Sequence, residues 1–255
     1  MTTSQPSHLD RRRAESFGPV ADAYDRYRPP FPPEVIERLL PVPGMTVLNV
    51  GAGTGMVSAP MAAAGANVLA VEPDPLMAEK ARAKGIVVEE ATFEEWDARG
   101  RTFDLVVFAR SFHWVDPQVA LARIPSLLNP DGRLALLWNR AAAVEPSEAR
   151  IREIYREVCG ADAVPTTREA SRAEDRAHEL LTSAGLTPTI DRFAVETHVS
   201  TEDYVNLAFT YSRQLTLDAD TAARLRSRLT EFLGPDGVRV RNSTVALVCR
   251  VPAAA

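Results

Sequence analysis

The feature that most constrains this fold is a short apolar run followed at once by three closely spaced glycines. The run covers residues 47–50, and the glycines are Gly51, Gly53 and Gly55. An apolar run rich in β-branched residues predicts a strand that is buried on both faces. Glycines at every second position let the chain turn sharply and bring backbone N–H groups close to a ligand. The stretch therefore predicts a turn that binds a nucleoside-bearing small molecule.

The helix predicted over residues 56–64 points the positive end of its dipole at the same turn. A dinucleotide site has the pattern G-x-G-x-x-G, whose third glycine lets helix and strand pack closely. Here the third glycine, Gly55, comes one residue early and Met56 stands in its place. The spacing therefore disfavours a dinucleotide site, although a glycine-rich turn alone is a weak signal.

Strand and helix patterns alternate after this turn. The predicted strands are 67–71, 86–89, 103–109 and 133–139, and the predicted helices are 75–84 and 117–128. Such alternation indicates βαβ units and a parallel, doubly wound sheet in an α/β protein.

The two ends of the chain lack this regular alternation of strands and helices. We expect a flexible N-terminus at residues 1–12 and a single domain over 13–255. Further helices are predicted at 148–158, 172–184, 202–210 and 218–233, and further strands at 189–197 and 244–251. The predicted helical cover of the domain consists of residues 13–40, 140–170 and 200–232.

Composition excludes several classes of function. The formal net charge of −5 argues against a general nucleic-acid binder, which usually has a basic face. Cys159 and Cys249 lie far apart and the four histidines show no ligand spacing, so we expect reduced thiols and no metal. No apolar run approaches the ~20 residues of a membrane span. The polar start lacks the apolar core of a signal peptide, so we expect a cytoplasmic protein.

Glu72 is the first candidate site residue outside the turn. It lies at the end of the second predicted strand, 21 residues after Gly51. In doubly wound folds an acid at this place accepts hydrogen bonds from ribose hydroxyls. The alternative is a solvated carboxylate before Pro73. Because turn and acid arrive together at the expected separation, we favour the ribose-binding role.

Three segments resemble the class I S-adenosylmethionine-dependent methyltransferases. They read VLNVGAGTG at 47–55, VEPDPLM at 71–77 and FDLVVFARSFHWVDP at 103–117. The chain is most similar to the small-molecule, type-11-like branch, which carries Phe-His-Trp after the fourth strand, and residues 17–29 also resemble that branch. The resemblance is strong over 17–139 and weaker towards the C-terminus. It implies a seven-stranded Rossmann-like sheet whose last strand, residues 244–250, runs antiparallel.

The resemblance also implies a cofactor, S-adenosylmethionine, and its product S-adenosylhomocysteine. Gly51, Ala52 and Gly53 would approach the amino-acid part and the ribose. The other implied cofactor positions are Glu72 at the ribose hydroxyls, Pro73 beside the adenine, Thr92 and Phe93 at the adenine edge, and Ala109 and Arg110 under the sulfonium.

Asn49 departs from the family pattern, which usually has Asp at this position to anchor the glycine turn. Asparagine keeps a carbonyl acceptor and two donors but loses the charge. We expect cofactor binding to survive in weakened form. Loss of methyl transfer with retained cofactor binding stays open as an alternative.

Two further pairs of residues are candidates around the cofactor. His113, four residues past Ala109, is the candidate catalytic base, since its neutral form exists near pH 7 and a base adds ~10²–10⁴-fold to a rate. The alternative is that His113 and Trp114 line or pack against a substrate pocket. Tyr24 and Arg28 are expected to close over the cofactor, with Arg28 pairing its carboxylate. The alternative is a packed helix face for Tyr24 and a surface charge for Arg28.

The leading hypothesis is methyl transfer to an oxygen or nitrogen, less readily a carbon, of a small molecule. Alternatives are a related enzyme that keeps the cofactor structurally and performs another reaction such as a cyclisation, a dinucleotide-dependent oxidoreductase, and a non-enzymatic binding module. Four aromatic residues are candidates for an acceptor pocket, with plain core as the default: Trp138, Phe209, Tyr211 and Phe232. The sequence gives neither the acceptor nor the oligomeric state.

Overall fold

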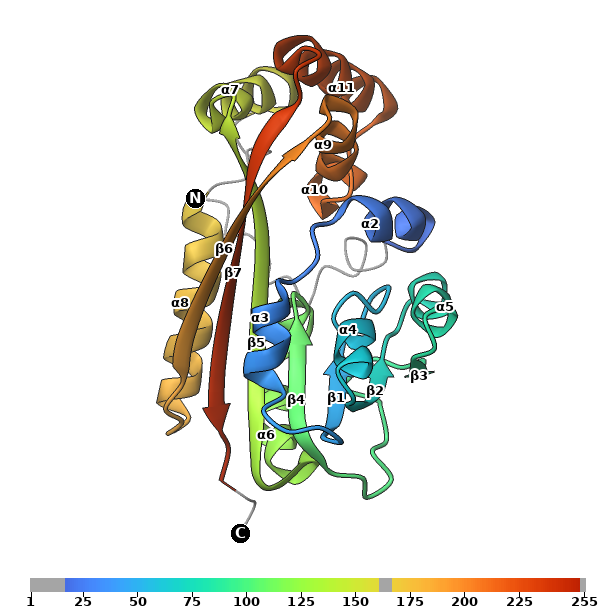
Figure 1. Cartoon of the computed structure of the whole chain (residues 1–255), viewed down its shortest axis with the longest axis vertical. Coiled ribbons are helices and arrows are strands. Elements are labelled where there is room, and N and C mark those ends of the chain that lie inside the picture. Colours follow the sequence, from blue (N-terminus) through green and yellow to red (C-terminus); the bar gives the residue numbers. More distant parts are fainter. Residues whose placement is uncertain (1–16, 161–166, 253–255) are drawn as a thin grey trace.

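The fold is built on one seven-stranded sheet, seen in a computed structural model that describes residues 17–160 and 167–252 (Figure 1). The strand order is β3-β2-β1-β4-β5-β7-β6. Strands β1 to β5 pair in parallel, whereas β7 is antiparallel to both of its neighbours, β5 and β6. This confirms the predicted doubly wound α/β fold with an antiparallel last strand. The predicted flexible N-terminus, residues 1–12, lies outside the described residues.

The seven strands lie close to the predicted ranges, except at the ends of β5 and β7. They are β1 (Thr46–Val50), β2 (Asn67–Val71), β3 (Val87–Glu89), β4 (Phe103–Ala109), β5 (Leu128–Glu145), β6 (Thr189–Val199) and β7 (Val238–Arg250).

Helices cover both faces of the sheet and bury β1 from Val47 to Val50. On one face lie α3 (Pro33–Leu39), α4 (Ser58–Ala63) and α5 (Pro75–Ala83), and on the other α6 (Pro117–Leu127) and α8 (Thr167–Ser183). Successive side chains of a strand point to opposite faces. Val47 accordingly belongs to the hydrophobic core under α3 and α4, and Leu48 belongs to the core under α6 and α8. Both residues are fully buried.

The C-terminal half of β5 corrects one expectation. Residues 140–145 were expected to be helical, yet they continue the strand and pair with β7, from Arg140 opposite Ser243 to Glu145 opposite Arg239. The helical cover on this side begins only with α7 (Glu148–Cys159). The alanines at 141–143 favour helix locally, but pairing with a strand some hundred residues away outweighs that weak propensity. At its other end, β5 begins at Leu128 rather than at the predicted residue 133, with a register irregularity opposite β4.

The long ends of β5, β7 and β6 carry a second group of helices, which we call the upper lobe (Figure 1). It consists of α7, α9 (Thr201–Ala208), α10 (Ser212–Leu215) and α11 (Ala219–Leu233). The lobe has a hydrophobic core of its own, which includes Ile154, Val205, Leu225 and Leu229. Its helices lie beyond the carboxyl ends of β1 and β4, the edge of the sheet where ligands bind in doubly wound folds.

The N-terminal helix α2 (Ala21–Tyr27), preceded by the short turn η2 (Gly18–Val20), lies between the upper lobe and the rest of the sheet. Asp25 on α2 accepts a hydrogen bond from Thr54 Oγ1 at 2.7 Å and forms an ion pair with Lys84. Arg28, directly after α2, donates to the carbonyl oxygen of Thr210 beside α9 at 2.8 Å. The helix is therefore tied to both parts. Within the described ranges, no helix is both long and apolar enough to span a membrane.

Candidate functional site

A cavity of about 850 Å³ lies between the carboxyl edge of the sheet and the upper lobe. Its floor is formed by the ends of β1, β2 and β4 and by residues 138–141 of β5, one side by α2, and its roof by α7, α9 and α10. This volume is within the range of about 300–1,000 Å³ that is typical of small-molecule sites.

The glycine turn forms part of the floor. Gly51 and Gly53 adopt φ values of +62° and +58°, in the left-handed region that favours glycine. A Cβ atom at Gly51 would lie 2.5 Å from the Cβ of Ser111, so no larger residue fits there. The Gly51 N–H donates to the carbonyl of Val71 at 2.8 Å, which fixes the turn against β2. The turn thus exposes backbone to the cavity, as predicted.

Glu72 lies beside this turn and is 7% exposed. Its carboxylate accepts hydrogen bonds from the Gly53 N–H at 2.7 Å and the Asp74 N–H at 3.0 Å. Burial raises the pKa of Glu72 to about 7, although both N–H donors act in the opposite direction. A buried carboxylate of this kind is suited to accept hydrogen bonds from ligand hydroxyls.

The loop that contains Thr92 and Phe93 forms the next part of the wall. Phe93 is buried, with its ring centroid 5.6 Å from that of Phe108 in β4. Arg123 of α6 donates hydrogen bonds to the backbone carbonyls of Phe93, Glu94 and Trp96, and its guanidinium lies over the Phe93 ring. The Arg123 side chain thus holds this loop in place.

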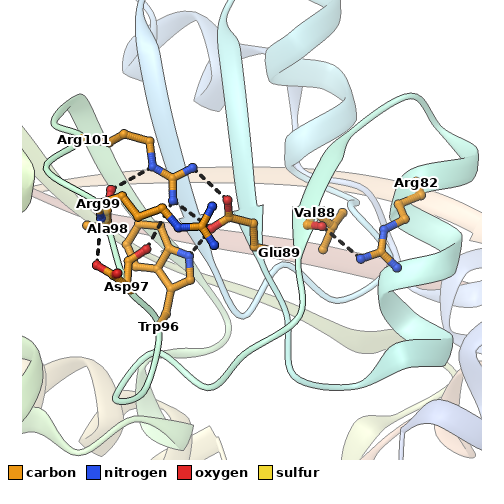
Figure 2. Close-up of polar contacts among 8 residues, drawn as sticks. All are labelled: Arg82, Val88, Glu89, Trp96, Asp97, Ala98, Arg99 and Arg101. Carbon is orange, nitrogen blue, oxygen red and sulfur yellow. Dashed lines mark hydrogen bonds and ion pairs between the residues drawn. The ribbon is translucent and has the colours of Figure 1, made fainter.

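A second arginine holds the far end of the same loop (Figure 2). Arg101 donates to both carboxylate oxygens of Glu89 at 2.8 Å, and the indole N–H of Trp96 donates to one of them. These hydrogen bonds lower the pKa of Glu89 to about 2. The contacts join the end of β3 to residues 96–101.

Arg28 is the most unusual group in the cavity. It is only 5% exposed, and its guanidinium carbon lies 3.7 Å from the ring centroid of Tyr211 and 4.9 Å from that of Tyr24. Its Nε atom is buried without a hydrogen-bond partner. Burial, and then the nearby charge of Arg110, lower the pKa of Arg28 to about 10. Such a buried cation needs an anion, and a ligand carboxylate can supply it.

Ala109 and Arg110 end β4 at the centre of the floor. Arg110 has a φ of +61°, and its N–H donates to the carbonyl of Leu137 at 2.8 Å. Non-glycine residues seldom adopt this conformation. The guanidinium carbon lies 5.5 Å from the Tyr24 ring centroid, on the cavity side.

His113 and Trp114 lie in the short turn η3 (Phe112–Trp114) after β4. Their ring centroids are 4.6 Å apart, and Trp114 also meets the edge of Phe17 at 6.1 Å. Both residues line the cavity, and His113 is exposed to solvent.

Asn49 is the only predicted cofactor-binding residue that does not line the cavity. It is fully buried behind the glycine turn, where its amide Nδ2 donates to Ser58 Oγ of α4 at 2.7 Å. Its Oδ1 has no hydrogen-bond partner. Asn49 thus supports the turn indirectly. The other predicted residues all line the cavity: Tyr24, Arg28, Gly51, Ala52, Gly53, Glu72, Pro73, Thr92, Phe93, Ala109, Arg110, His113 and Trp114.

The sequence patterns predicted few of the residues that line the half of the cavity under the upper lobe. Tyr155 of α7 and Tyr204 of α9 line it, with the buried Gln214 of α10, whose Oε1 has no partner. Of the four aromatic candidates, Trp138 and Tyr211 line the cavity, whereas Phe209 and Phe232 pack in the core of the upper lobe. Among the residues that the structure describes, no cluster of three His, Cys, Asp or Glu is arranged to hold a metal.

Comparison with known proteins shows which proteins this chain is similar to. Residues 24–145 match the family described as the methyltransferase domain. This match covers just under half of the chain, and it bears out the predicted resemblance to the class I S-adenosylmethionine-dependent methyltransferases.

Individual relatives agree with this assignment. An uncharacterized methyltransferase of Mycobacterium tuberculosis is 41% identical over 126 residues, which are 49% of this chain and 52% of that protein. The chain thus spans about half the length of the curated relatives that it matches.

Solved structures share the fold over more of the chain. A protein of Anaeromyxobacter dehalogenans assigned as a type II methyltransferase aligns over 89% of this chain and 100% of its own, with a TM-score of 0.62 and 19% identity. A methyltransferase of Geobacter sulfurreducens, solved in complex with S-adenosylhomocysteine, aligns over 93% of this chain and 98% of its own, with a TM-score of 0.51 and 13% identity.

Proposed function

We propose that this protein is an S-adenosylmethionine-dependent methyltransferase that methylates an oxygen or nitrogen, less readily a carbon, of a small molecule. The observation that carries the proposal is the placement of two buried charged groups in one cavity. Glu72 lies beside the glycine turn, and Arg28, which has no acidic partner among the described residues, lies under the upper lobe. A ligand with ribose hydroxyls and an amino-acid carboxylate complements both.

The residues of the cavity fit this cofactor. The Glu72 carboxylate would accept hydrogen bonds from the ribose hydroxyls, and the backbone of Gly51, Ala52 and Gly53 would approach the amino-acid part. Pro73, Thr92 and Phe93 would enclose the adenine, since they line the wall next to Glu72. Tyr24 and Arg28 would close over the opposite end, with the guanidinium pairing with the carboxylate.

When bound, S-adenosylmethionine supplies a methyl group that is already electrophilic. The protein then has to hold the acceptor in line with that group, and correct positioning alone can supply ~7–11 kcal/mol of the barrier. Ala109 and Arg110 form part of the cavity floor, and Trp114 forms part of the cavity wall. His113 lines the cavity and is exposed to solvent; in this proposal it would take a proton from an acceptor hydroxyl or amine and pass it to water.

Two alternatives receive less support. The matched domain and its relatives are methyltransferases, which favours methyl transfer over a cyclisation with a retained cofactor. A dinucleotide cofactor is disfavoured because Met56, at the place of the third glycine of the dinucleotide pattern, lines the cavity.

Isothermal titration calorimetry tests the proposal directly. We expect S-adenosylmethionine and S-adenosylhomocysteine to bind with one site per chain and NAD not to bind. Arg28→Gln should weaken binding of S-adenosylhomocysteine, while Arg150→Gln, an exposed arginine on α7, should not. Binding of NAD in place of the adenosyl compounds would refute the proposal.

His113 is tested separately, with an acceptor found by screening small molecules for methyl transfer. His113→Asn should slow turnover near neutral pH and leave the affinity for S-adenosylhomocysteine unchanged. An unaltered pH–rate profile would assign His113 to the pocket wall only.

A further inference from the structure

Two arginines face the cavity without an acidic partner. The guanidinium carbons of Arg28 and Arg110 lie 4.9 Å and 5.5 Å from the ring centroid of the same residue, Tyr24. The hydrogen bond of the Arg28 side chain goes to a backbone carbonyl, and the side-chain contact of Arg110 is with the Tyr24 ring. Within the described ranges, neither residue forms an ion pair.

The two carboxylates under the upper lobe do not neutralise these arginines. Glu148 pairs with Arg140 at 3.8 Å, and Glu174 pairs with Arg192 at 3.2 Å. Their charges are therefore balanced by other residues.

The five carboxylates on the opposite side are also engaged elsewhere. Glu72 accepts from backbone N–H groups, and Asp74 and Asp116 cap the N-termini of α5 and α6. Glu94 accepts from the Asp116 N–H, and Glu95 accepts from the Thr92 hydroxyl. Every acidic side chain that lines the cavity thus has a partner other than Arg28 and Arg110.

The proposed cofactor can neutralise only one of the two arginines. It has a single carboxylate, which the proposed function assigns to Arg28, and it adds a positively charged sulfonium beside Arg110. Charges in a largely apolar cavity are stable only when they are compensated. A carboxylate on the remaining ligand, the methyl acceptor, would supply the second anion.

We propose, on the basis of the proposed function, that the acceptor is a small organic acid whose carboxylate pairs with Arg110. A guanidinium matches a carboxylate with two parallel hydrogen bonds, which gives orientation as well as affinity. The remainder of the acceptor would lie against Trp138, Tyr155 and Tyr204, whose aromatic rings line the adjoining walls. Arg110 is then the residue that selects the charge of the acceptor.

The backbone of Arg110 supports this role. Its φ of +61° directs the chain away from the line of β4, and the hydrogen bond from its N–H to Leu137 holds that conformation. Uncommon backbone conformations of this kind are concentrated at ligand sites, where the surrounding structure fixes them.

The experiment compares three probes of similar size on protein saturated with S-adenosylhomocysteine: benzoate, benzyl alcohol and benzylammonium. Calorimetric titration should give benzoate at least about tenfold tighter binding than the other two, because a charge-assisted pair contributes at least one decade of affinity. That preference should shrink as the salt concentration rises.

Substitutions of Arg110 test whether this side chain causes the preference for benzoate. Arg110→Gln should abolish it and Arg110→Lys should retain part of it, and either variant should lose less affinity for S-adenosylhomocysteine than Arg28→Gln, since the cofactor carboxylate is assigned to Arg28. Arg99→Gln is the matched control, because Arg99 is exposed and also has a positive φ, 52°.

Three outcomes would overturn the inference. Equal affinities for the three probes would refute the proposal that the acceptor is an acid. An Arg110→Gln variant that loses S-adenosylhomocysteine as strongly as Arg28→Gln would assign Arg110 to the cofactor. Failure of the wild type to bind S-adenosylhomocysteine would refute the proposed function itself, and this inference with it.

Discussion

At the scale of single residues, the surroundings of a charged group rather than its position in the sequence decide its ionisation. Glu72 and Glu89 are both glutamates at strand ends, yet burial raises the pKa of the first to about 7 while Arg101 lowers that of the second to about 2. One is thereby adapted to a ligand and the other to a permanent ion pair. The sequence pointed to Glu72 because its separation from the glycine turn is characteristic, whereas the pKa of either group depends on contacts that no local pattern encodes.

The pH dependence of cofactor binding follows from Glu72. Ribose hydroxyls donate to the ionised carboxylate, and below a pKa of about 7 that form becomes scarce in the free protein. Affinity for S-adenosylhomocysteine should therefore rise about tenfold between pH 6 and pH 8, as the ionised fraction does. Calorimetry at the two pH values measures this. Glu72→Gln should remove the dependence and Glu79→Gln, an exposed glutamate on α5, should retain it; a dependence that persists in Glu72→Gln would exclude Glu72 as its source.

Asn49 is predicted to affect stability through its contact behind the turn. Asn49→Ala leaves the buried Ser58 hydroxyl without its donor, so the free energy of unfolding should fall by ~1–3 kcal/mol. Urea unfolding measures the change. The control is Asn67→Ala, whose exposed amide donates to the Gly44 carbonyl, with an expected loss below ~1 kcal/mol. Equal losses in both variants would contradict the supporting role of Asn49.

At the scale of elements, local sequence patterns predicted most strands and helices well. They failed where pairing with a distant strand determines the structure. The boundaries of β2 and β4 agree with the predicted ranges, since apolar residues predominate in both segments. Residues 140–145 carry no such signal, and become strand only because β7 lies beside them. Tyr155 was missed for a related reason: it shares the apolar face of α7 with core residues, and only the packing of the upper lobe brings it to the cavity.

The loop at the predicted adenine edge depends on one residue of another element, Arg123 of α6. Arg123→Met removes the donors to the carbonyls of Phe93, Glu94 and Trp96. Hydrogen exchange of amides 93–97 should accelerate by about tenfold or more, since bonds to a charged group contribute ~1.5–3 kcal/mol. Mass spectrometry of exchanged peptides measures this, with Arg150→Met as the exposed control. Unchanged exchange in Arg123→Met would show that the loop is held by the contacts of Arg101 alone.

At the scale of the whole molecule, the upper lobe and the sheet have separate cores joined by long strands and by α2. Leu225 is fully buried in the lobe, and Leu105 is fully buried in the sheet. Either residue changed to alanine should lower stability by ~2–5 kcal/mol. Leu225→Ala should accelerate hydrogen exchange mainly in α7, α9 and α11, and Leu105→Ala throughout the chain. Equal acceleration of β1 and β4 in both variants would mean that the two cores unfold as one unit.

The separation of these two cores bears on how the substrate range of such a protein can change. The walls proposed for the acceptor come mostly from the upper lobe, whereas the turn and the acid proposed for the nucleoside come from the sheet. Substitutions in the lobe can therefore alter which acceptor fits without disturbing the packing beneath the adenosyl group. An engineer wishing to redirect this protein would diversify the lobe-facing tyrosines and leave the glycine-bearing edge untouched.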